Sequence, residues 1–324
     1  MTYAKIIADS ISPEGVRLTT MEVRFHRFVL AEFNTHRVFS RNSASSRAIP
    51  VRKQIERIQD GIAYPVSWPL EQKGMQGGAE LPPSLKIDAR DAWHRAMSGA
   101  VKAVRNLTEK EDGALHKSVA NRLLEPFMWH TVVCTATAWG NFFALRLDAD
   151  AQPEIRVAAE AMKAAYDEST PVRIGEGEWH APYVDGKDGS RVLGQTMGSE
   201  RKAWEVLTKV SAARCARVSY LTQDGRRDMD EDLRLYDRLV TDRVGAGKPV
   251  HWSPLEHVAT PWAANRQGNP LYFPTFAPEP DRPGWVQQTD HRVEVDHLPR
   301  VGNLLGWRSL RTEVEAIHNE RTFR

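Results

Sequence analysis

The sequence predicts an α+β fold, with long helices packed on a modest antiparallel or mixed sheet. Over residues 21–25 hydrophobic side chains alternate with charged ones, which is the period of a half-buried strand. Apolar residues recur every three or four positions from about 87 to 109, which predicts an amphipathic helix. Pro153 stands at the first-turn position that proline favours, so a third pattern predicts a helix that begins there.

The remaining elements follow from shorter patterns of the same kind. Helical spacing is expected over 28–33, 119–124, 138–147, from 204 onward, and over 233–240, where Gly245 and Gly247 end the helix. Glycine and proline are frequent in 60–85, which predicts an irregular connection, and glycines in 175–200 predict a loop or a small ribbon. The segment from 258 to about 300 is rich in proline and asparagine and allows both strands and loops.

Composition is that of an ordinary globular protein. The 324 residues are 41% hydrophobic and 27% charged, enough for a buried core in one large domain or two smaller ones. The net charge is +2, from 44 basic and 42 acidic residues, which excludes a uniformly basic coat for nucleic acid. Cys134 and Cys215 make neither a disulfide framework nor a zinc site. No signal peptide or membrane-spanning run is recognised, so a soluble, cytoplasmic protein is expected.

The densest polar segment runs from His36 to Arg47. It holds three guanidinium groups, four hydroxyls, an amide and an imidazole in twelve residues. Small side chains let backbone N–H groups approach an anion, and arginine offers forked donors that suit phosphate. These residues therefore indicate a phosphate or nucleotide loop, with a solvated polar turn as the alternative.

This segment resembles the signature of the flavin-dependent thymidylate synthase (thymidylate synthase complementing protein) family, R-H-R-x-x-S-x-N-x-x-S-x-R. The matching positions are His36, Arg37, Ser40, Asn42, Ser45 and Arg47, and Thr35 replaces the first arginine. Residues 119–126, V-A-N-R-L-L-E-P, resemble the family's V-A-R-x-x-L-P segment with one residue inserted. Residues 141–155 resemble its N-F-x-x-x-R-x-x-x-x-A-Q-x-E-I helix.

Two further segments resemble the family but stand in an unusual place. Residues 213–220 are similar to its A-A-R-V-S-Y element, and residues 251–257 to its H-x-S/T-P-F-E-H element. In the family both precede the signature, whereas here both follow it, as in a circular permutation. Residues 302–308 echo the strand and helix that normally come next. We therefore expect one enlarged unit over 1–324, with a signature and substrate-arginine half at 1–170 and a displaced half at 200–324.

The resemblance implies flavin-dependent C5 methylation of dUMP to dTMP. It implies FAD as the cofactor, NADPH and methylenetetrahydrofolate as co-substrates, and a homotetramer, with no metal, membrane or nucleic-acid partner. Arg146 matches the arginine that the family directs at the pyrimidine ring. The 5′-phosphate is assigned to Ser45, Ser46, Arg47 and Arg122. The flavin side is assigned to His36, Arg37, Ser40, Asn42, Asn141, Ser219, His251, Ser253 and Glu256.

Departures from the family pattern leave other outcomes open. Ser43 replaces a glutamate, and Thr135-Ala136-Thr137 replaces the family's N-x-R. C5 hydroxymethylation, another pyrimidine deoxynucleotide such as a cytosine nucleotide, or a catalytically silent nucleotide- or nucleic-acid-binding protein are the alternatives, and Arg146 could instead belong to a buried structural ion pair.

Other motifs carry no site. Residues 74–78 lack the Lys-Ser/Thr of a phosphate loop. The pairs Asp290-His291 and Asp296-His297 fit a surface turn better than a metal site.

Overall fold

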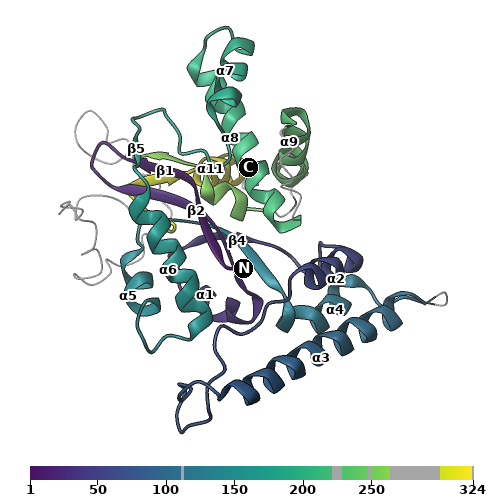
Figure 1. Ribbon diagram of the computed structural model, residues 1–324. Helices are drawn as coiled ribbons and strands as arrows, with labels where there is room; N and C mark the ends of the chain where they lie inside the picture. Colours follow the sequence, from purple (N-terminus) through teal and green to yellow (C-terminus); the bar gives the residue numbers. More distant parts are fainter. Residues whose placement is uncertain (111–112, 221–227, 247, 249, 263–299, 323–324) are drawn as a thin grey trace.

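The computed structural model describes residues 1–110, 113–220, 228–246, 248, 250–262 and 300–322, without the side chains of Tyr220 and of 317–322. Its centre is a five-stranded mixed sheet (Figure 1). In spatial order the strands are β3 (Ser40–Ser43), β4 (Trp129–Ala136), β2 (Arg17–His26), β1 (Tyr3–Ile11) and β5 (Val172–Arg173). The β3–β4, β4–β2 and β2–β1 pairs are antiparallel, and β5 is parallel to β1. The predicted α+β class, with a modest mixed sheet, is confirmed.

Helices lie on both sides of this sheet. The first half of the chain forms a 3₁₀ turn η1 (Arg27–Val29), α1 (Leu30–Asn34), α2 (Val51–Asp60), α3 (Pro83–Thr108), α4 (Lys117–Ala120), the 3₁₀ helix η2 (Asn121–Phe127), α5 (Gly140–Arg146) and α6 (Pro153–Glu168). The second half forms α7 (Gly186–Gln195), α8 (Glu200–Arg217), η3 (Val218–Tyr220), α9 (Met229–Tyr236), the π-helical η4 (Asp237–Thr241), α10 (Asp242–Gly245), η5 (Ser253–His257) and α11 (Leu310–Thr322). Two small two-stranded sheets pair β6 (Ala259–Pro261) with β9 (Trp307–Ser309) and β7 (Arg300–Val301) with β8 (Leu304–Leu305). None of the described helices is long and apolar enough to cross a membrane.

The two faces of the sheet differ in chemistry. Because side chains alternate along a strand, Met21, Val23 and Phe25 share one face, where they pack with the aromatic residues of α5 and the apolar stripe of α6. The opposite face carries polar residues, among them Thr20 of β2 and Thr135 of β4. Helix α8 and η5 belong to this second side, and η5 contacts both β3 and β4. The apolar face therefore anchors the fold, and the polar face is available for other roles.

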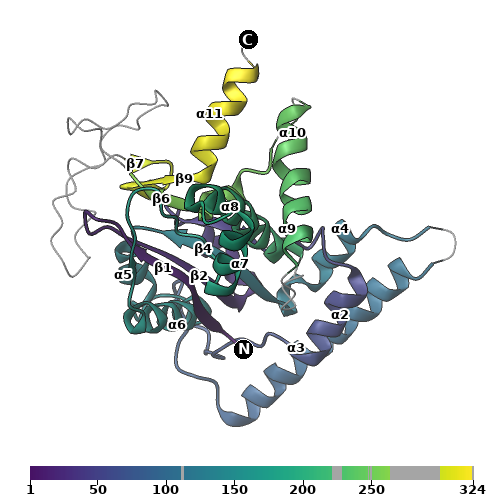
Figure 2. The ribbon, with the colours of Figure 1, turned by 90° about the horizontal axis from the view of Figure 1, so that it is seen from above.

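Helix α3 extends along one flank of the molecule, joined to the body through α2 and η2 (Figures 1 and 2). Met97, Val101 and Val104 form its buried stripe and pack against Ile58 and Leu124. Most of the rest of α3 is exposed to solvent. The apolar period predicted over 87–109 thus identifies the buried face of α3. The helix begins one turn earlier than predicted, at Pro83, which follows Pro82 at the N-cap.

Three features differ from the sequence expectations. The predicted loop after residue 40 begins as strand β3, since backbone pairing with β4 requires no apolar side chains. Helix α7 lies within the segment predicted to be a loop. A capping box formed by Asp185 and Asp188 and the burial of Val192 compensate for its glycines. Strands β1 and β4 had no specific prediction, and residues 263–299, including the Asp-His pairs near 290, lie outside the described residues.

Helix α8 is fixed by a buried charge network. Arg214, only 5% exposed, forms ion pairs with Asp188 of α7 and Asp232 of α9. Arg217 binds the other oxygen of Asp232 at 2.7 Å. A buried guanidinium requires such partners, because an unpaired charge in this environment would be strongly destabilising. The network therefore holds the 213–220 segment in one position relative to α7 and α9.

Candidate functional site

The signature segment begins in an aromatic environment. The His36 ring stacks on Phe39, with centroids 5.8 Å apart, and meets the edge of Phe142 of α5 at 4.9 Å. Burial, with the charges of Arg146 and Arg41, lowers the pKa of His36 to about 4. The imidazole is therefore neutral near pH 7, and one ring nitrogen is free to accept a hydrogen bond.

Arg146 supplies that hydrogen bond. Its Nε donates to His36 Nε2 at 2.9 Å, and its Nη2 donates to Thr35 Oγ1 at 3.1 Å and to the Glu32 carbonyl at 3.3 Å. Among the described residues Arg146 forms no ion pair with a carboxylate. Its side-chain hydrogen bonds within these residues go to an imidazole, a hydroxyl and a backbone carbonyl. Thr35, which stands in place of the family's first arginine, accepts a hydrogen bond from Arg146 where a second guanidinium would repel it.

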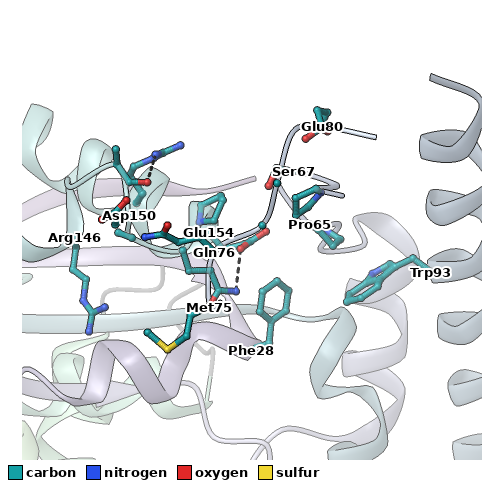
Figure 3. Close-up of a pocket in the computed structure, with 18 residues that line it drawn as sticks. Phe28, Pro65, Ser67, Met75, Gln76, Glu80, Trp93, Arg146, Asp150 and Glu154 are labelled. Carbon is teal, nitrogen blue, oxygen red and sulfur yellow. Dashed lines mark hydrogen bonds between the residues drawn. The ribbon is translucent and has the colours of Figure 1, made fainter. Parts of the chain in front are cut away.

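Arg146 also lines a pocket of about 800 Å³ (Figure 3). The pocket lies between the 65–80 connection, the start of α6, and the aromatic side chains Phe28 and Trp93. The Glu154 carboxylate fixes the connection, because it accepts hydrogen bonds from the Val66 N–H at 2.8 Å and from the Gln152 amide at 3.1 Å. The irregular connection predicted from glycine and proline thus packs on the body and forms one wall of a cavity.

The turn at residues 45–49 is held by Asn121. Asn121 is fully buried, and its amide donates to the carbonyls of Ser46, at 2.7 Å, and Ile49, at 3.0 Å. This contact brings the segments that carry Arg47 and Arg122 together. Arg47 is exposed, whereas Arg122 is paired with Glu125 at 2.7 Å. Sequence reasoning missed the role of Asn121, although the one extra residue of V-A-N-R-L-L-E-P was the available signal.

The two displaced segments lie against the signature. The Ser45 N–H donates to the Ser219 carbonyl at 2.9 Å, and the Asn42 amide donates to the Cys215 carbonyl at 3.3 Å. Helix η5, which contains Ser253 and Glu256, packs on β3. Segments separated by about two hundred residues therefore meet along one edge strand.

The other candidate side chains fall into two groups. His36, Ser40, Asn42 and Glu256 have protein partners, Ser40 accepting from Asn303 at 3.3 Å and Glu256 pairing with Arg311. Arg37, Asn141, His251 and Ser253 make no side-chain hydrogen bond within the described part of the chain, and all but Ser253 are exposed. The first group builds the frame, and the second leaves its donors and acceptors available.

A sequence comparison matches the first part of this constellation to a known family. The sequence profile of the family described as thymidylate synthase complementing protein matches residues 14–172. The match covers just under half of the chain and indicates a flavin-dependent thymidylate synthase-like enzyme. The match spans the signature, the V-A-N-R-L-L-E-P segment and the Arg146 helix, whereas the 213–220 and 251–257 segments lie beyond it.

Solved structures show more distant similarity. A UMP/dUMP methylase, PolB, from Streptomyces cacaoi bound with 5-Br dUMP is 16% identical, with a TM-score of 0.39 over 52% of this chain and 90% of its own. The flavin-dependent thymidylate synthase ThyX from Helicobacter pylori, complexed with FAD and dUMP, is 18% identical, with a TM-score of 0.32 over 46% and 67%. A search of curated proteins found no sequence match.

Beside the family segments, a hydrogen-bonded row crosses the polar face of the sheet. His257 Nδ1 lies 2.8 Å from Thr135 Oγ1, which lies 2.6 Å from Thr20 Oγ1. Thr20 in turn lies 2.7 Å from His180 Nε2, and His180 Nδ1 lies 2.9 Å from Ser10 Oγ. Burial lowers the pKa of both histidines to about 3, so both rings are neutral near pH 7.

The unpaired ring nitrogen of His257 indicates which atoms of this row donate hydrogen bonds and which accept them. His257 Nε2 is buried and has no hydrogen-bond partner among the residues that the structure describes. A buried N–H without an acceptor is rarer than an acceptor without a donor, so Nε2 carries the lone pair and Nδ1 carries the proton. Each hydroxyl then donates onward, from Thr135 to Thr20 and from Thr20 to His180. Thr135, which departs from the family pattern, thus ties η5 to the sheet, and Thr137 likewise accepts the Leu305 N–H at 3.1 Å.

This row predicts a specific dependence of stability on pH. Because the folded-state pKa of His180 and of His257 is depressed, only the unfolded chain takes up these protons between about pH 6.5 and pH 3. The free energy of unfolding should therefore be highest above pH 6.5 and fall as the pH is lowered. His180→Asn should reduce this fall, measured by urea unfolding at pH 7.5, 6.5 and 5.5. His94→Asn, an exposed site on α3, is the control, and equal slopes for wild type and His180→Asn would contradict the assignment.

Proposed function

We propose that this chain catalyses C5 methylation of dUMP to dTMP, with FAD as cofactor and with methylenetetrahydrofolate and NADPH as co-substrates. The observation that carries the proposal is the packing of the displaced 213–220 and 251–257 segments against the signature strand β3. The family match covers residues 14–172, and the two remaining family-like segments stand beside them in space. Their side chains complete a set of donors that a phosphate-bearing flavin and a nucleotide both need.

The residues present fit a flavin. Arg37, Asn141, His251 and Ser253 offer a guanidinium, an amide, an imidazole and a hydroxyl that no described residue uses. His36, Ser40, Asn42 and Glu256 are bound to neighbouring groups and fix the strands and turns that carry them. When bound, FAD supplies the redox chemistry, and the chain contributes binding, orientation and charge.

Arg146 is proposed to polarise the pyrimidine. Uracil C5 becomes nucleophilic when electron density moves into the ring, and a cation at the O2/N3 edge stabilises that form. Three hydrogen bonds from Nε and Nη2 orient the guanidinium toward the signature, and Nη1 has no partner within the described residues. This fixed orientation is what a group that acts mainly on the transition state requires, because its position is set before the substrate binds.

The phosphate end is assigned to the Asn121-supported turn. Arg47 is exposed and has no ion-pair partner among the described residues, so its full charge is available to a phosphate dianion. Ser45 and Ser46 lie on the same turn, and Arg122 would have to exchange Glu125 for the ligand. That pair is exposed and therefore weak. A homotetramer, in which neighbouring subunits complete the site, is part of the proposal.

A different product is the second candidate. Ser43 and the two threonines of 135–137 change the charge around the base and the flavin relative to the family pattern. Hydroxymethylation or a cytosine nucleotide as substrate would follow from such a change. The deciding experiment incubates the purified protein with FAD, NADPH, methylenetetrahydrofolate and either dUMP or dCMP, and identifies the product by mass. A mass gain of one methyl group on dUMP supports the proposal. Retained flavin without a product from dUMP would contradict it, and absence of flavin binding would favour a silent nucleotide-binding protein.

Replacing Arg47 should weaken nucleotide binding selectively. A charge-assisted hydrogen bond contributes about 1.5–3 kcal/mol, so Arg47→Ala should weaken dUMP binding by about tenfold or more. Deoxyuridine, which lacks the phosphate, should bind almost as before. Isothermal titration of both ligands measures the difference, with Arg52→Ala on the exposed face of α2 as the control. A similar loss for both ligands would place Arg47 away from the phosphate.

Replacing Arg146 by lysine should reduce catalysis more than binding. Lysine keeps the charge but loses the planar fork, so Arg146→Lys should lower kcat by about tenfold or more while dUMP affinity falls less. Reduction of the flavin by NADPH should persist because it does not involve the base. Thr35→Val, which removes one of the hydrogen bonds that orient Arg146, is the matched control for loss of orientation. A folded Arg146→Lys variant that retains flavin and wild-type turnover would exclude the catalytic role.

A further inference from the structure

Two half-buried arginines, one on β2 and one on α2, form no ion pair with a carboxylate of the described residues. Arg24 lies on β2 and Arg57 on α2. Each is only partly exposed, and no ion pair joins either to an acidic residue within the described ranges. Arg24 Nε is buried and has no hydrogen-bond partner in the described part of the chain. An arrangement of this kind is unusual, because buried guanidinium groups are normally paired.

Local geometry places Arg24 and the helix that carries Arg57 beside the same two residues of the chain, Met128 and Trp129. The Arg24 guanidinium carbon stands 5.3 Å above the centre of the Trp129 ring. Gln54, one turn before Arg57 on the same face of α2, donates its amide to the sulfur of Met128, the residue before Trp129. The Trp129 ring thus lies beneath Arg24, and α2 lies beside it.

Positive charge lowers the pKa of groups near these two arginines. After burial, the charge of Arg24 is the next cause that lowers the pKa of Arg57. Burial and then the charges of Arg27 and Arg57 lower the pKa of His130 to about 3. The nearest acid on the strand, Glu22, is occupied by the hydroxyls of Tyr3 and Tyr183, both at 2.8 Å. Arg27, in contrast, is neutralised by Glu125 at 3.0 Å.

We propose that Arg24 and Arg57, over the Trp129 ring, form an anion site that binds the phosphate or diphosphate group of a nucleotide. Two forked guanidinium groups offer several parallel N–H donors, which is the arrangement that phosphate oxygens match best. The bound anion would supply the missing counter-charge and satisfy the orphan Nε. The exposed fraction of both side chains leaves a route from solvent.

This site is distinct from the Arg47 turn. Arg57 lies ten residues beyond Arg47, and six residues of α2 alone advance about 9 Å along the axis. The proposal therefore does not depend on the proposed reaction. It adds a second place where a nucleotide phosphate binds, on the polar face of the sheet.

The test uses binding and stability. Inorganic phosphate and pyrophosphate are titrated into the full-length protein by calorimetry. Thermal midpoints are compared with those in chloride at equal ionic strength, because a ligand of the folded state alone raises the midpoint. Wild type should gain stability from both anions. Arg24→Gln and Arg57→Gln should each weaken pyrophosphate binding tenfold or more and lose most of the gain. In chloride, Arg57→Gln should have a thermal midpoint no lower than that of wild type, because the substitution removes the repulsion between the two guanidinium groups.

Two controls separate this site from other effects. Arg52→Gln, on the same helix and exposed, should keep the full gain. Titration of AMP and ADP beside adenosine distinguishes monophosphate from diphosphate recognition. The proposal is overturned if wild type gains nothing over chloride, if the gain survives both Arg24→Gln and Arg57→Gln, or if Arg57→Gln unfolds early in chloride.

Discussion

The antiparallel pairing of β3 with β4 is the interaction on which the site depends. Four residues of β3 are polar, so this strand is held by its backbone and not by apolar burial. The pairing places His36 before the strand and Ser45 after it, at opposite ends of a rigid segment. Elements from both sides of the sheet contact this edge. Helix α5 does so through the aromatic contact of Phe142 with His36, and η5 packs directly on β3. Loss of the pairing would displace both the proposed flavin residues and the proposed phosphate residues.

A polar sheet face makes the rearranged chain order workable. In a sheet with two apolar faces, a covering segment can slide without large loss, because hydrophobic contacts are not directional. Here the contacts between the halves include hydrogen bonds with defined partners, such as His257 with Thr135 and Ser45 with Ser219. Directional contacts specify one position for η5 and η3 even though about two hundred residues separate them from the signature along the chain.

Much of the fold could be predicted from periodicity, because α3 and α6 and strand β2 have clear one-sided apolar patterns. Strand β3 and helix α7 could not, since β3 depends on a partner strand distant in sequence and α7 on its capping box. Within the site, residue types indicated the signature loop, and the structure brings its predicted neighbours beside it. Asn121, His180 and Thr20 were missed because their roles arise only from tertiary contacts. Single buried polar residues carry no period that a sequence pattern could reveal.

Both cysteines of this chain are buried, Cys134 in the sheet and Cys215 in α8. Burial raises the pKa of the Cys134 thiol to about 12 and raises that of Cys215 as well. Since the thiolate is the form that reacts with alkylating reagents, the native protein presents almost no reactive sulfur. A cysteine introduced on the exposed side of α3 would therefore react selectively in the wild-type background. A dye or spin label placed there could report assembly and ligand binding without removal of either native cysteine.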